Sequence, residues 1–298
     1  MLKHSYAKGF KPARVVILGA RGFIAGAIRR QLENDGITTL AIGRPTMDLL
    51  APEAIERLEE VLTPDDTLII VSAKAPCKGL STLRENLLMV ETVCAVLQRS
   101  PVAHVIYLSS DAVYKDSTEP LTELSCAEPN SLHGVMHLAR EVALRQVHSG
   151  PLAILRPTLV YGFDDPHNGY GPNLFRRQAA AGNEIVLFGE GEEQRDHVDV
   201  GDVAELVRLL VVHRSEGIAN AVSGQVASFC ELAEFVSQSF PTRVPVRSTL
   251  RSGSMPHNGY RAFDNHAVLS AFPSFSPKMW REGLSAVHWR QMSEEKLK

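Results

Sequence analysis

The sequence predicts an α/β fold in which a doubly wound parallel sheet is followed by a smaller C-terminal α/β unit. Two observations carry this prediction. In the first half of the chain, short apolar runs that suit buried strands alternate with longer helical segments, which is typical of crossover units in a parallel sheet. After Arg156 this alternation gives way to short elements joined by loops rich in Gly, Pro, Asp and Asn, which predicts the second unit.

The individual strands and helices follow from local periodicity. Apolar, β-branched runs predict strands over 14–18, 37–42, 67–71, 103–109 and 151–155. Helical spacing of apolar residues predicts helices over 23–34, 52–62, 82–98 and 132–148. The second unit is expected to contain a helix over 174–181 and a strand over 185–188, followed by a charged stretch with glycine hinges over 190–202. Residues 1–13 are expected to form a loose leader.

Composition limits the classes of protein and of partner. The chain has 298 residues, of which 44% are hydrophobic and 22% charged, which is typical of a globular protein and excludes a disordered or fibrous chain. The formal net charge of -3 lacks the basic excess of nucleic-acid binders, so we expect no nucleic acid as a partner. No apolar run is long enough to span a bilayer, so we expect no membrane partner. The four cysteines contain no C-x-x-C pair, which favours reduced thiols and a cytoplasmic location.

A glycine-rich turn, GARGFIAG from Gly19 to Gly26, lies between the first predicted strand and the first predicted helix. Glycines at this place permit a tight turn and a close approach to a pyrophosphate, and the helix N-terminus offers N–H groups to negative charge. A glycine triplet alone is weak evidence, but strand, turn and amphipathic helix form the context that a Rossmann-type dinucleotide site requires. The sequence therefore predicts that residues 14–162, with a return of 195–225, bind a dinucleotide, and that 163–194 and 226–298 bind the substrate.

The glycine turn and three later segments together resemble the extended short-chain dehydrogenase/reductase family of nucleotide-sugar epimerases, dehydratases and ketoreductases. The later segments are YLSSDAVY from Tyr107, RPTLVYG from Arg156 and QRDHVDV from Gln194. The resemblance implies an NAD(P) cofactor and a small-molecule nucleotide sugar as the substrate. It also implies a set of cofactor contacts, namely Gly19, Gly22, Phe23, Ile24, Asp48, Leu49, Ala73, Lys74, Asn86 and Pro157.

The end of the second predicted strand indicates which nicotinamide cofactor is preferred. An acidic residue there binds the ribose 2′-hydroxyl of NAD, whereas an arginine accommodates the 2′-phosphate of NADP. The strand is followed by Arg44 without a carboxylate, and Arg21 lies in the neighbouring glycine turn. Because a guanidinium offers a phosphate two aligned, charged hydrogen bonds, we predict NADP as the cofactor and NAD as the alternative. A solvated surface role for Arg44 stays open.

The predicted catalytic helix departs from the family pattern at two positions. The family's acid–base pair is a Tyr and a Lys four residues later, in the pattern P-x-x-x-Y-G-x-x-K. The corresponding segment here, PNSLHGVMH, places His133 at the Tyr and His137 at the Lys. An imidazole, with a pKa of about 6.5, exchanges protons near neutral pH without the help that a tyrosine needs. We therefore predict His133 as acid or base, Ser110 as its hydrogen-bonding partner, and His137 as a contact to the cofactor ribose.

Three interpretations of this replacement compete. In the first, His133 supplies proton transfer to an epimerase or a ketoreductase. In the second, the catalytic pair has decayed, and the chain is an NAD(P)-binding regulator or scaffold without turnover. In the third, His133 and His137 form half of a metal site, but no nearby residue supplies a third ligand, so we predict no metal. The sequence leaves the first two interpretations open.

Two residues are assigned to the substrate. Arg195 lies in the segment that, by the resemblance, contacts a diphosphate, and its alternative is a surface ion pair with Asp196 or Glu193. Asn173, which follows a Gly-Pro turn, is the second candidate. The resemblance also implies a homodimer that is joined through the helices over 82–98 and 132–148. Neither the sugar nor the net reaction follows from the sequence.

Overall fold

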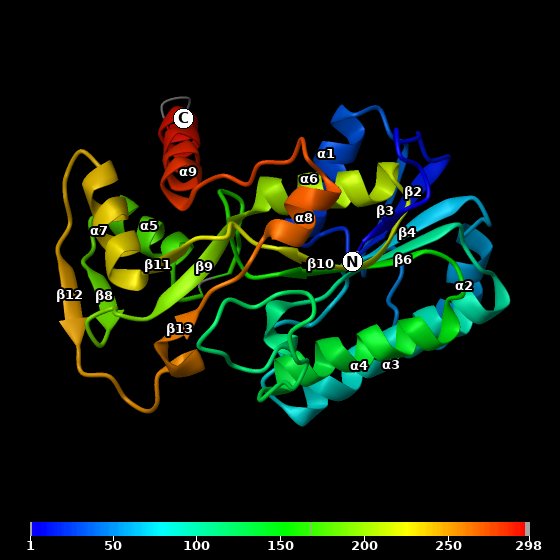
Figure 1. Ribbon diagram of the computed structural model, residues 1–298, viewed down its shortest axis with the longest axis horizontal. Coiled ribbons are helices and arrows are strands. Elements are labelled where there is room, and N and C mark those ends of the chain that lie inside the picture. Colours follow the sequence, from blue (N-terminus) through cyan, green and yellow to red (C-terminus); the bar gives the residue numbers. More distant parts are fainter. Residues whose placement is uncertain (1, 168, 296–298) are drawn as a thin grey trace.

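A seven-stranded sheet is the largest element of the computed structural model, which describes residues 2–167 and 169–295 (Figure 1). The strand order is β1-β10-β6-β5-β4-β2-β3, and every neighbouring pair is parallel except β1 with β10. In chain order the strands are β1 (Lys3–His4), β2 (Arg14–Leu18), β3 (Thr39–Ile42), β4 (Asp66–Ile70), β5 (His104–Leu108), β6 (Leu152–Pro157) and β10 (Ser215–Ala221). The predicted doubly wound α/β class is confirmed.

Helices cover both faces of this sheet, so that the sheet is the middle of three layers (Figure 1). The helices α1 (Phe23–Asn34) and α6 (Val200–Val212) lie together on one face. The helices α3 (Leu80–Arg99) and α4 (Leu132–Val147) lie together on the other, with α2 (Ala54–Val61) beside α3. The connections between parallel strands thus run through helices, as the alternating sequence predicts.

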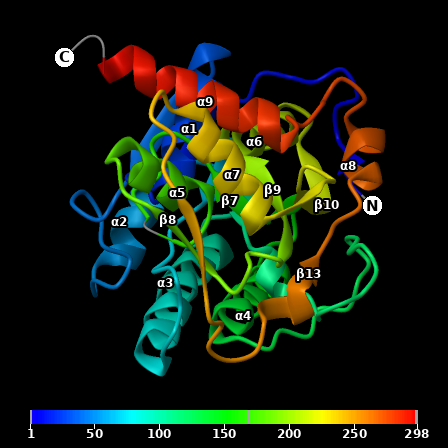
Figure 2. The ribbon, with the colours of Figure 1, turned by 90° about the vertical axis from the view of Figure 1, so that its left-hand side faces the viewer.

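A smaller part of the molecule lies beyond one end of the large sheet, and Figure 2 looks onto it. It holds a four-stranded sheet, a two-stranded sheet and several helices. The strands are β7 (Leu159–Tyr161), β9 (Gln194–Asp199), β11 (Val226–Ser228) and β13 (Tyr260–Arg261), with β8 (Ile185–Phe188) paired to β12 (Val246–Thr249). The helices are α5 (Pro172–Ala180), α7 (Phe229–Ser239) and α9 (Trp280–Glu295), while α8 (His266–Ala271) packs against β10. Two 3-10 turns, η1 (Asp111–Val113) and η2 (Pro256–Gly259), complete the elements.

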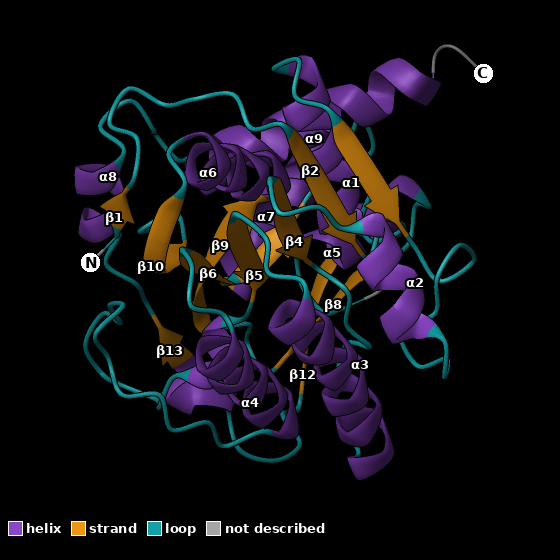
Figure 3. Ribbon diagram, turned by 90° about the vertical axis from the view of Figure 1, so that its right-hand side faces the viewer, coloured by secondary structure: helices purple, strands orange, loops and turns teal. Residues whose placement is uncertain are grey.

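The large sheet contributes to two separate hydrophobic cores, one on each face. Figure 3 shows the helices that cover the two faces. Val15 and Ile17 of β2 belong to the core under α1 and α6, whereas Val16 and Leu18 belong to the core under α3. Successive side chains of a strand point to opposite faces, so the continuous apolar run of β2 serves both cores. A third core, which includes Phe175, holds the smaller part together.

One expectation about the chain is wrong, and one strand was not predicted. Residues 1–13 are not a loose leader throughout, because β1 pairs with β10 and the Phe10 N–H donates to the Val212 carbonyl at 2.7 Å. The charged stretch over 190–202 contains strand β9, whose Arg195, Asp196 and His197 are all buried. The charged residues of this strand have partners inside the protein. A buried strand with so many charged residues lacks the apolar pattern by which strands are predicted from sequence. Among the described helices, none is both long enough and apolar enough to cross a membrane.

Candidate active site

The glycine turn brings the end of β2 against the end of β4. Gly19 has a φ of +100°, and a Cβ at this position would lie 2.7 Å from the backbone nitrogen of Ser72. Glycine alone satisfies both conditions without strain. The N–H of Gly22 donates to the Gly19 carbonyl at 2.9 Å, and α1 begins at the next residue. The turn therefore exposes backbone at a helix N-terminus, which is a cradle that a pyrophosphate fits.

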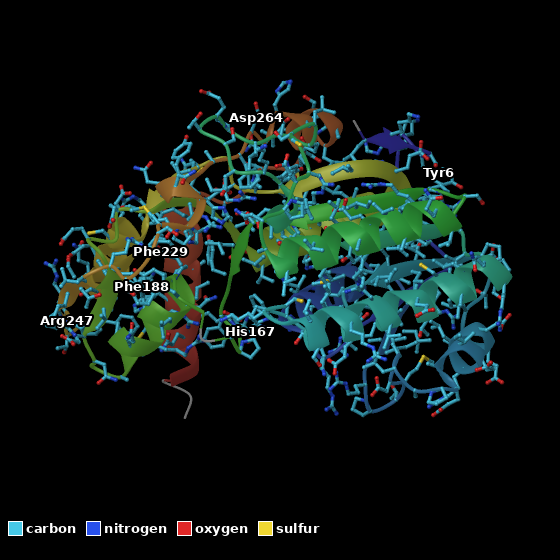
Figure 4. The ribbon with its side chains drawn as sticks, turned by 90° about the horizontal axis from the view of Figure 1, so that it is seen from below. Tyr6, His167, Phe188, Phe229, Arg247 and Asp264 are labelled. Atoms are coloured by element: carbon cyan, nitrogen blue, oxygen red, sulfur yellow. The ribbon has the colours of Figure 1, made fainter. Side chains whose placement is uncertain are left out.

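Two cavities flank this turn. The arginine cavity, of about 580 Å³, is lined by Leu18, Gly19, Arg21, Ile42, Gly43, Arg44, Pro45, Met47, Asp48, Leu49, Ser72, Ala73 and Met89. The histidine cavity, of about 340 Å³, is lined by Gly22, Phe23, Ile24, Val71, Ala73, Ala75, Leu159, Val160, Asp165, His167, Gly169, Tyr170, Gly171, Pro172, Asn173 and His197. Ala73 lines both, so the cavities adjoin. His167 lies where the smaller part meets the large sheet (Figure 4).

The arginine cavity collects most of the predicted contacts to the adenosine end of a dinucleotide. Arg21 and Arg44 are both exposed, and neither has an acidic partner in the part of the chain that the structure describes. The Asp48 carboxylate accepts from the Leu50 N–H at 3.1 Å, so it also shapes the local turn. The cavity thus combines apolar walls with two positive groups that are free to meet an anion.

The segment after β4 lies between the cavities and helix α4, on which the predicted acid–base residues lie. The Asn86 side chain is fully buried, and it accepts from the Lys74 N–H at 2.9 Å and donates to the Lys74 carbonyl at 3.0 Å. The Lys74 ammonium pairs with Glu85 at 2.5 Å. Asn86 therefore positions this segment and offers no free amide to a ligand. Within the segment Ala75 lines the histidine cavity, and the Cys77 N–H points to His133.

The two histidines of α4 lie one helical turn apart and in contact. Their ring centroids are 4.8 Å apart and the rings are almost perpendicular. His133 is half-buried, and its Nδ1 accepts from the Cys77 N–H at a long 3.4 Å. His137 is buried, and its Nδ1 lies 2.7 Å from the hydroxyl of the buried Tyr107. Neither histidine of α4 lines the histidine cavity. His133 contacts the Cys77 N–H, and Ala75, two residues earlier in the chain, lines the cavity.

The environment keeps both histidines neutral. Burial lowers the pKa of His133, and the negative charge of Asp111 opposes part of this shift. Burial, with the repulsion that a protonated His133 would add and the positive charge of Arg140, lowers the pKa of His137 well below its usual value. Burial raises the pKa of Tyr107 to about 12, so its hydroxyl keeps its proton and forms a hydrogen bond with Nδ1 of His137. The Cys77 N–H donates to Nδ1 of His133, which places the proton of the neutral His133 ring on Nε2.

Ser110 lies next to this pair but is not hydrogen-bonded to His133. Its Oγ accepts from the Ala112 N–H at 3.2 Å and donates to Asp111 at 3.4 Å. The first turn of α4 packs so closely on this loop that a Cβ at Gly134 would clash with the Ala112 carbonyl. The predicted Ser110–His133 hydrogen bond is therefore wrong for this structure, although the two residues belong to neighbouring, tightly packed segments.

The predicted substrate residues are engaged with the protein itself. Arg195 is 8% exposed, donates to Glu193 at 3.1 Å and lies 3.9 Å from Asp111. The sequence left an ion pair with Glu193 as the alternative to substrate binding. The structure contains this ion pair, but the pair is buried and does not lie at the surface. Asn173 lines the histidine cavity; its amide oxygen accepts from the Gly162 N–H at 3.2 Å, and its nitrogen donates to Asp165 at 2.5 Å.

Pro157, predicted to lie beside the nicotinamide, is the last residue of β6 and is buried. It lines neither cavity, whereas Leu159 and Val160, which follow it closely, line the histidine cavity. Among the described residues no group of three His, Cys, Asp or Glu side chains could hold a metal ion.

Sequence reasoning missed two residues near the site. Arg261 is 2% exposed and donates from Nε to Asp111 at 2.8 Å, so it joins the buried charges around Arg195. It is distant in sequence from every motif, and no local signal identifies it. Tyr107, the partner of His137, is the first residue of the motif YLSSDAVY, but only the three-dimensional structure shows that it contacts helix α4.

Comparison with known proteins places this geometry in a family. The sequence model of the NAD dependent epimerase/dehydratase family matches residues 15–222, which is more than half of the chain. The chain belongs to this family. Its relatives include the putative GDP-L-fucose synthase 2 of Oryza sativa subsp. japonica, 27% identical over 256 residues that cover 76% of this chain and 73% of that protein. The dTDP-L-rhamnose 4-epimerase of Burkholderia thailandensis is 29% identical over 171 residues, covering 54% of this chain and 45% of that protein.

Solved structures agree with the family's fold. The UDP-glucose 4-epimerase of Thermus thermophilus, in complex with NAD, has a TM-score of 0.81 at 22% identity and covers 93% of this chain and 99% of its own. The GDP-L-fucose synthetase from Naegleria fowleri, bound to NADP, has a TM-score of 0.81 at 16% identity and covers 97% and 96%. Homologues thus carry NAD in one case and NADP in another, and they act on nucleotide sugars by their names.

Proposed function

We propose that this chain is an NADP-dependent epimerase or ketoreductase that acts on a nucleotide-activated sugar, with His133 as its acid–base residue. One observation carries the proposal. The glycine turn runs between two adjoining cavities, with Gly19 and Arg21 in the arginine cavity and Phe23 and Ile24 in the histidine cavity. Such a slot, bent around a helix N-terminus, suits the two halves of a dinucleotide.

The residues of the slot fit an NADP molecule. Gly19 leaves the backbone cradle open, because a Cβ there would collide with Ser72. Arg21 and Arg44 supply positive charge for a 2′-phosphate, and their lack of acidic partners among the described residues supports NADP over NAD. When bound, the nicotinamide supplies hydride transfer.

His133 is the proposed group that moves a proton. It is neutral because burial lowers the pKa of its imidazole, and its proton is on Nε2 because Nδ1 accepts from Cys77. Nε2 can share that proton with a keto or hydroxyl oxygen of the sugar. His137, which is held in place by its hydrogen bond with Tyr107, is the proposed ribose contact.

The substrate diphosphate is proposed to meet Arg195. In the structure this guanidinium is paired with Glu193, so a diphosphate would have to compete with that carboxylate. Asn173 is proposed to border the sugar, since it lines the histidine cavity. Residues 14–162 with 195–225 are the proposed cofactor unit, and 163–194 with 226–298 are the proposed substrate unit.

The function is tested by measuring turnover directly. The purified chain is incubated with NADPH and 4-keto nucleotide sugars, and with NADP or NAD and UDP-glucose or GDP-L-fucose, while nicotinamide absorbance and sugar products are followed. We expect hydride transfer or epimerisation that needs His133. Tight NADP binding without any product across the panel would contradict the enzymatic role.

A second function is supported by the buried charges. Because Arg195 and Arg261 are already paired with Glu193 and Asp111, the site offers a diphosphate little free positive charge. This favours the alternative of an NAD(P)-binding regulator or scaffold without turnover. The same panel separates the two, since the regulator binds NADP and leaves every sugar unchanged.

A homodimer in the cytoplasm completes the proposal. Several apolar side chains of α3 and α4 are exposed on the side away from the sheet, namely Leu87, Leu88, Val135 and Val142. Such a surface suits pairing with the same helices of a second copy. All four cysteines are free, which supports a reducing compartment. Light scattering of the purified chain tests the dimer, and a monomeric mass would contradict it.

A further inference from the structure

A buried histidine outside the catalytic helix has one nitrogen without a partner. His197, on β9, is 2% exposed and lines the histidine cavity. Its Nε2 has no hydrogen-bond partner among the described residues. The ring also packs edge-on against Phe229, with centroids 5.6 Å apart, so its orientation is fixed. Buried polar atoms are almost always hydrogen-bonded, so an unpaired one beside a cavity indicates a bound group that completes it.

The other nitrogen determines what kind of group that is. Nδ1 of His197 lies 3.1 Å from the backbone carbonyl of Arg195. A carbonyl oxygen can only accept, so Nδ1 carries the proton. Burial, together with the positive charge of Arg195, keeps the ring neutral by lowering its pKa to about 3. Nε2 is therefore an acceptor with a free lone pair.

The cavity wall around this acceptor is mostly apolar, although Asp165 and His167 also line the cavity. Phe23, Leu159 and Val160 give the cavity an apolar lining, and both ends of the Asn173 amide are occupied by Gly162 and Asp165. A phosphate oxygen cannot pair with Nε2, because both are acceptors at neutral pH.

We propose that Nε2 of His197 accepts a hydrogen bond from an O–H or N–H donor of the ligand in the histidine cavity. The donor is a hydroxyl of the sugar or the amide of the nicotinamide. His197 is thus a specificity residue that selects ligands with a donor at this point and disfavours those without one, because an unpaired buried acceptor is costly. The proposal deepens the proposed function and rests on it.

Two variants test the acceptor. His197→Phe keeps an aromatic ring and removes the nitrogen, whereas His197→Gln keeps an oxygen that can accept near the position of Nε2. Dissociation constants for NADP, UDP-glucose and GDP-L-fucose are measured by calorimetry for the wild type and both variants. We expect His197→Phe to weaken at least one probe by about ten-fold and His197→Gln to stay within about three-fold. Weaker sugar-nucleotide binding identifies a sugar hydroxyl, and weaker NADP binding identifies the nicotinamide amide.

The outcomes separate this proposal from the function on which it rests. If the wild type binds no probe, the proposed function fails and the donor proposal falls with it. If the wild type binds a probe and His197→Phe binds all of them equally well, only the donor proposal is overturned. The tautomer is checked without any variant, from long-range ¹H–¹⁵N spectra of the wild type near neutral pH. A protonated Nε2 would overturn the proposal.

Discussion

The arginine cavity and the region around His133 differ in how their polar groups are used. In the arginine cavity, Arg21 and Arg44 are exposed and have no acidic partner among the described residues, and the glycine turn leaves backbone open to a ligand. Near His133, by contrast, Arg195 and Arg261 are buried in ion pairs, and His137 is bonded to Tyr107. The arginine cavity, called the open region here, has positive groups that are free to bind an anion. The residues around His133, called the closed region, neutralise their charges through ion pairs and hydrogen bonds within the protein.

Under the proposed function, this contrast assigns cofactor binding and proton transfer to different parts of the site. Free charges beside a backbone cradle bind a dinucleotide with little rearrangement. A buried, paired charge has to be released before it can hold a substrate, and that release costs affinity. Cofactor binding should therefore depend on the open region, and turnover on the few groups of the closed region that are not fully engaged, above all His133.

The largest effect is expected at His133. His133→Ala should lower kcat by about 10³-fold, since general acid–base catalysis contributes roughly that much, while the Kd for NADP stays within about two-fold. His266→Ala, on α8 and outside both cavities, is the matched control and should leave kcat unchanged. Stopped-flow absorbance of the nicotinamide and a binding titration measure the two quantities. Equal turnover in the alanine variant would break the distinction between the two regions.

The second effect is expected at the cradle. Gly19→Ala should weaken NADP binding by about 100-fold, because the new Cβ meets the Ser72 backbone and the φ of +100° is strained for alanine. Gly26→Ala is the control, because a Cβ there meets only the end of the Arg30 side chain, at 3.6 Å. Fluorescence titration with NADP measures both. A Gly19→Ala variant that binds like the wild type would show that the turn is not the cofactor cradle.

The buried histidines should also make the stability of the protein sensitive to acid. The pKa of His197 is lowered to about 3 by burial, so the unfolded chain binds more protons below pH 6.5. The free energy of unfolding should therefore fall as the pH falls below 6.5, by up to about 1.4 kcal/mol per pH unit for this residue. His137 acts in the same direction, whereas Asp196, whose pKa burial raises to about 6, acts in the opposite one. Urea unfolding of the wild type and His197→Phe between pH 7 and 5 measures the slope, which should be smaller in the variant.

The smallest effect is expected at the open region's arginine. Arg44→Ala should weaken NADP by about ten-fold and leave NAD almost unchanged, because only NADP offers the 2′-phosphate. Arg29→Ala, which removes an exposed arginine of α1 that lines neither cavity, should change neither constant. Calorimetric titrations with both cofactors make the comparison. An equal loss for NAD and NADP would place the role of Arg44 elsewhere than at the phosphate.

The sequence was sufficient for the fold because its signals are local. The apolar run of β2, the glycine turn and the helical period of α1 are each contained in a few neighbouring residues, and α1 begins and ends where predicted. The sequence also pointed to Arg21 and Arg44 from local signals, the glycine turn and the end of the second strand, and both line one cavity.

The closed region could not be predicted, because its contacts join residues far apart in the chain. Arg261 reaches Asp111 across 150 positions, and Tyr107 meets His137 from another element. Strand β9 was not predicted because its charged residues are buried with partners that include the distant Ser223, Gly224 and Lys278. The departure of His133 and His137 from the family pattern was visible in the sequence. Their neutrality depends on burial, and the tautomer of His133 depends on the distant Cys77 N–H, and neither can be read from the sequence.

The imidazole of His133 is proposed to lie beside the bound dinucleotide, and the proposed chemistry depends on this placement. The test is to follow the Cε1–H resonance of His133 in ¹H–¹³C spectra while NADP is added. We predict that this resonance shifts with the NADP binding curve, while that of His213, which follows the end of α6 and contacts Tyr6, does not move. If saturating NADP leaves the His133 resonance unchanged, the placement is contradicted.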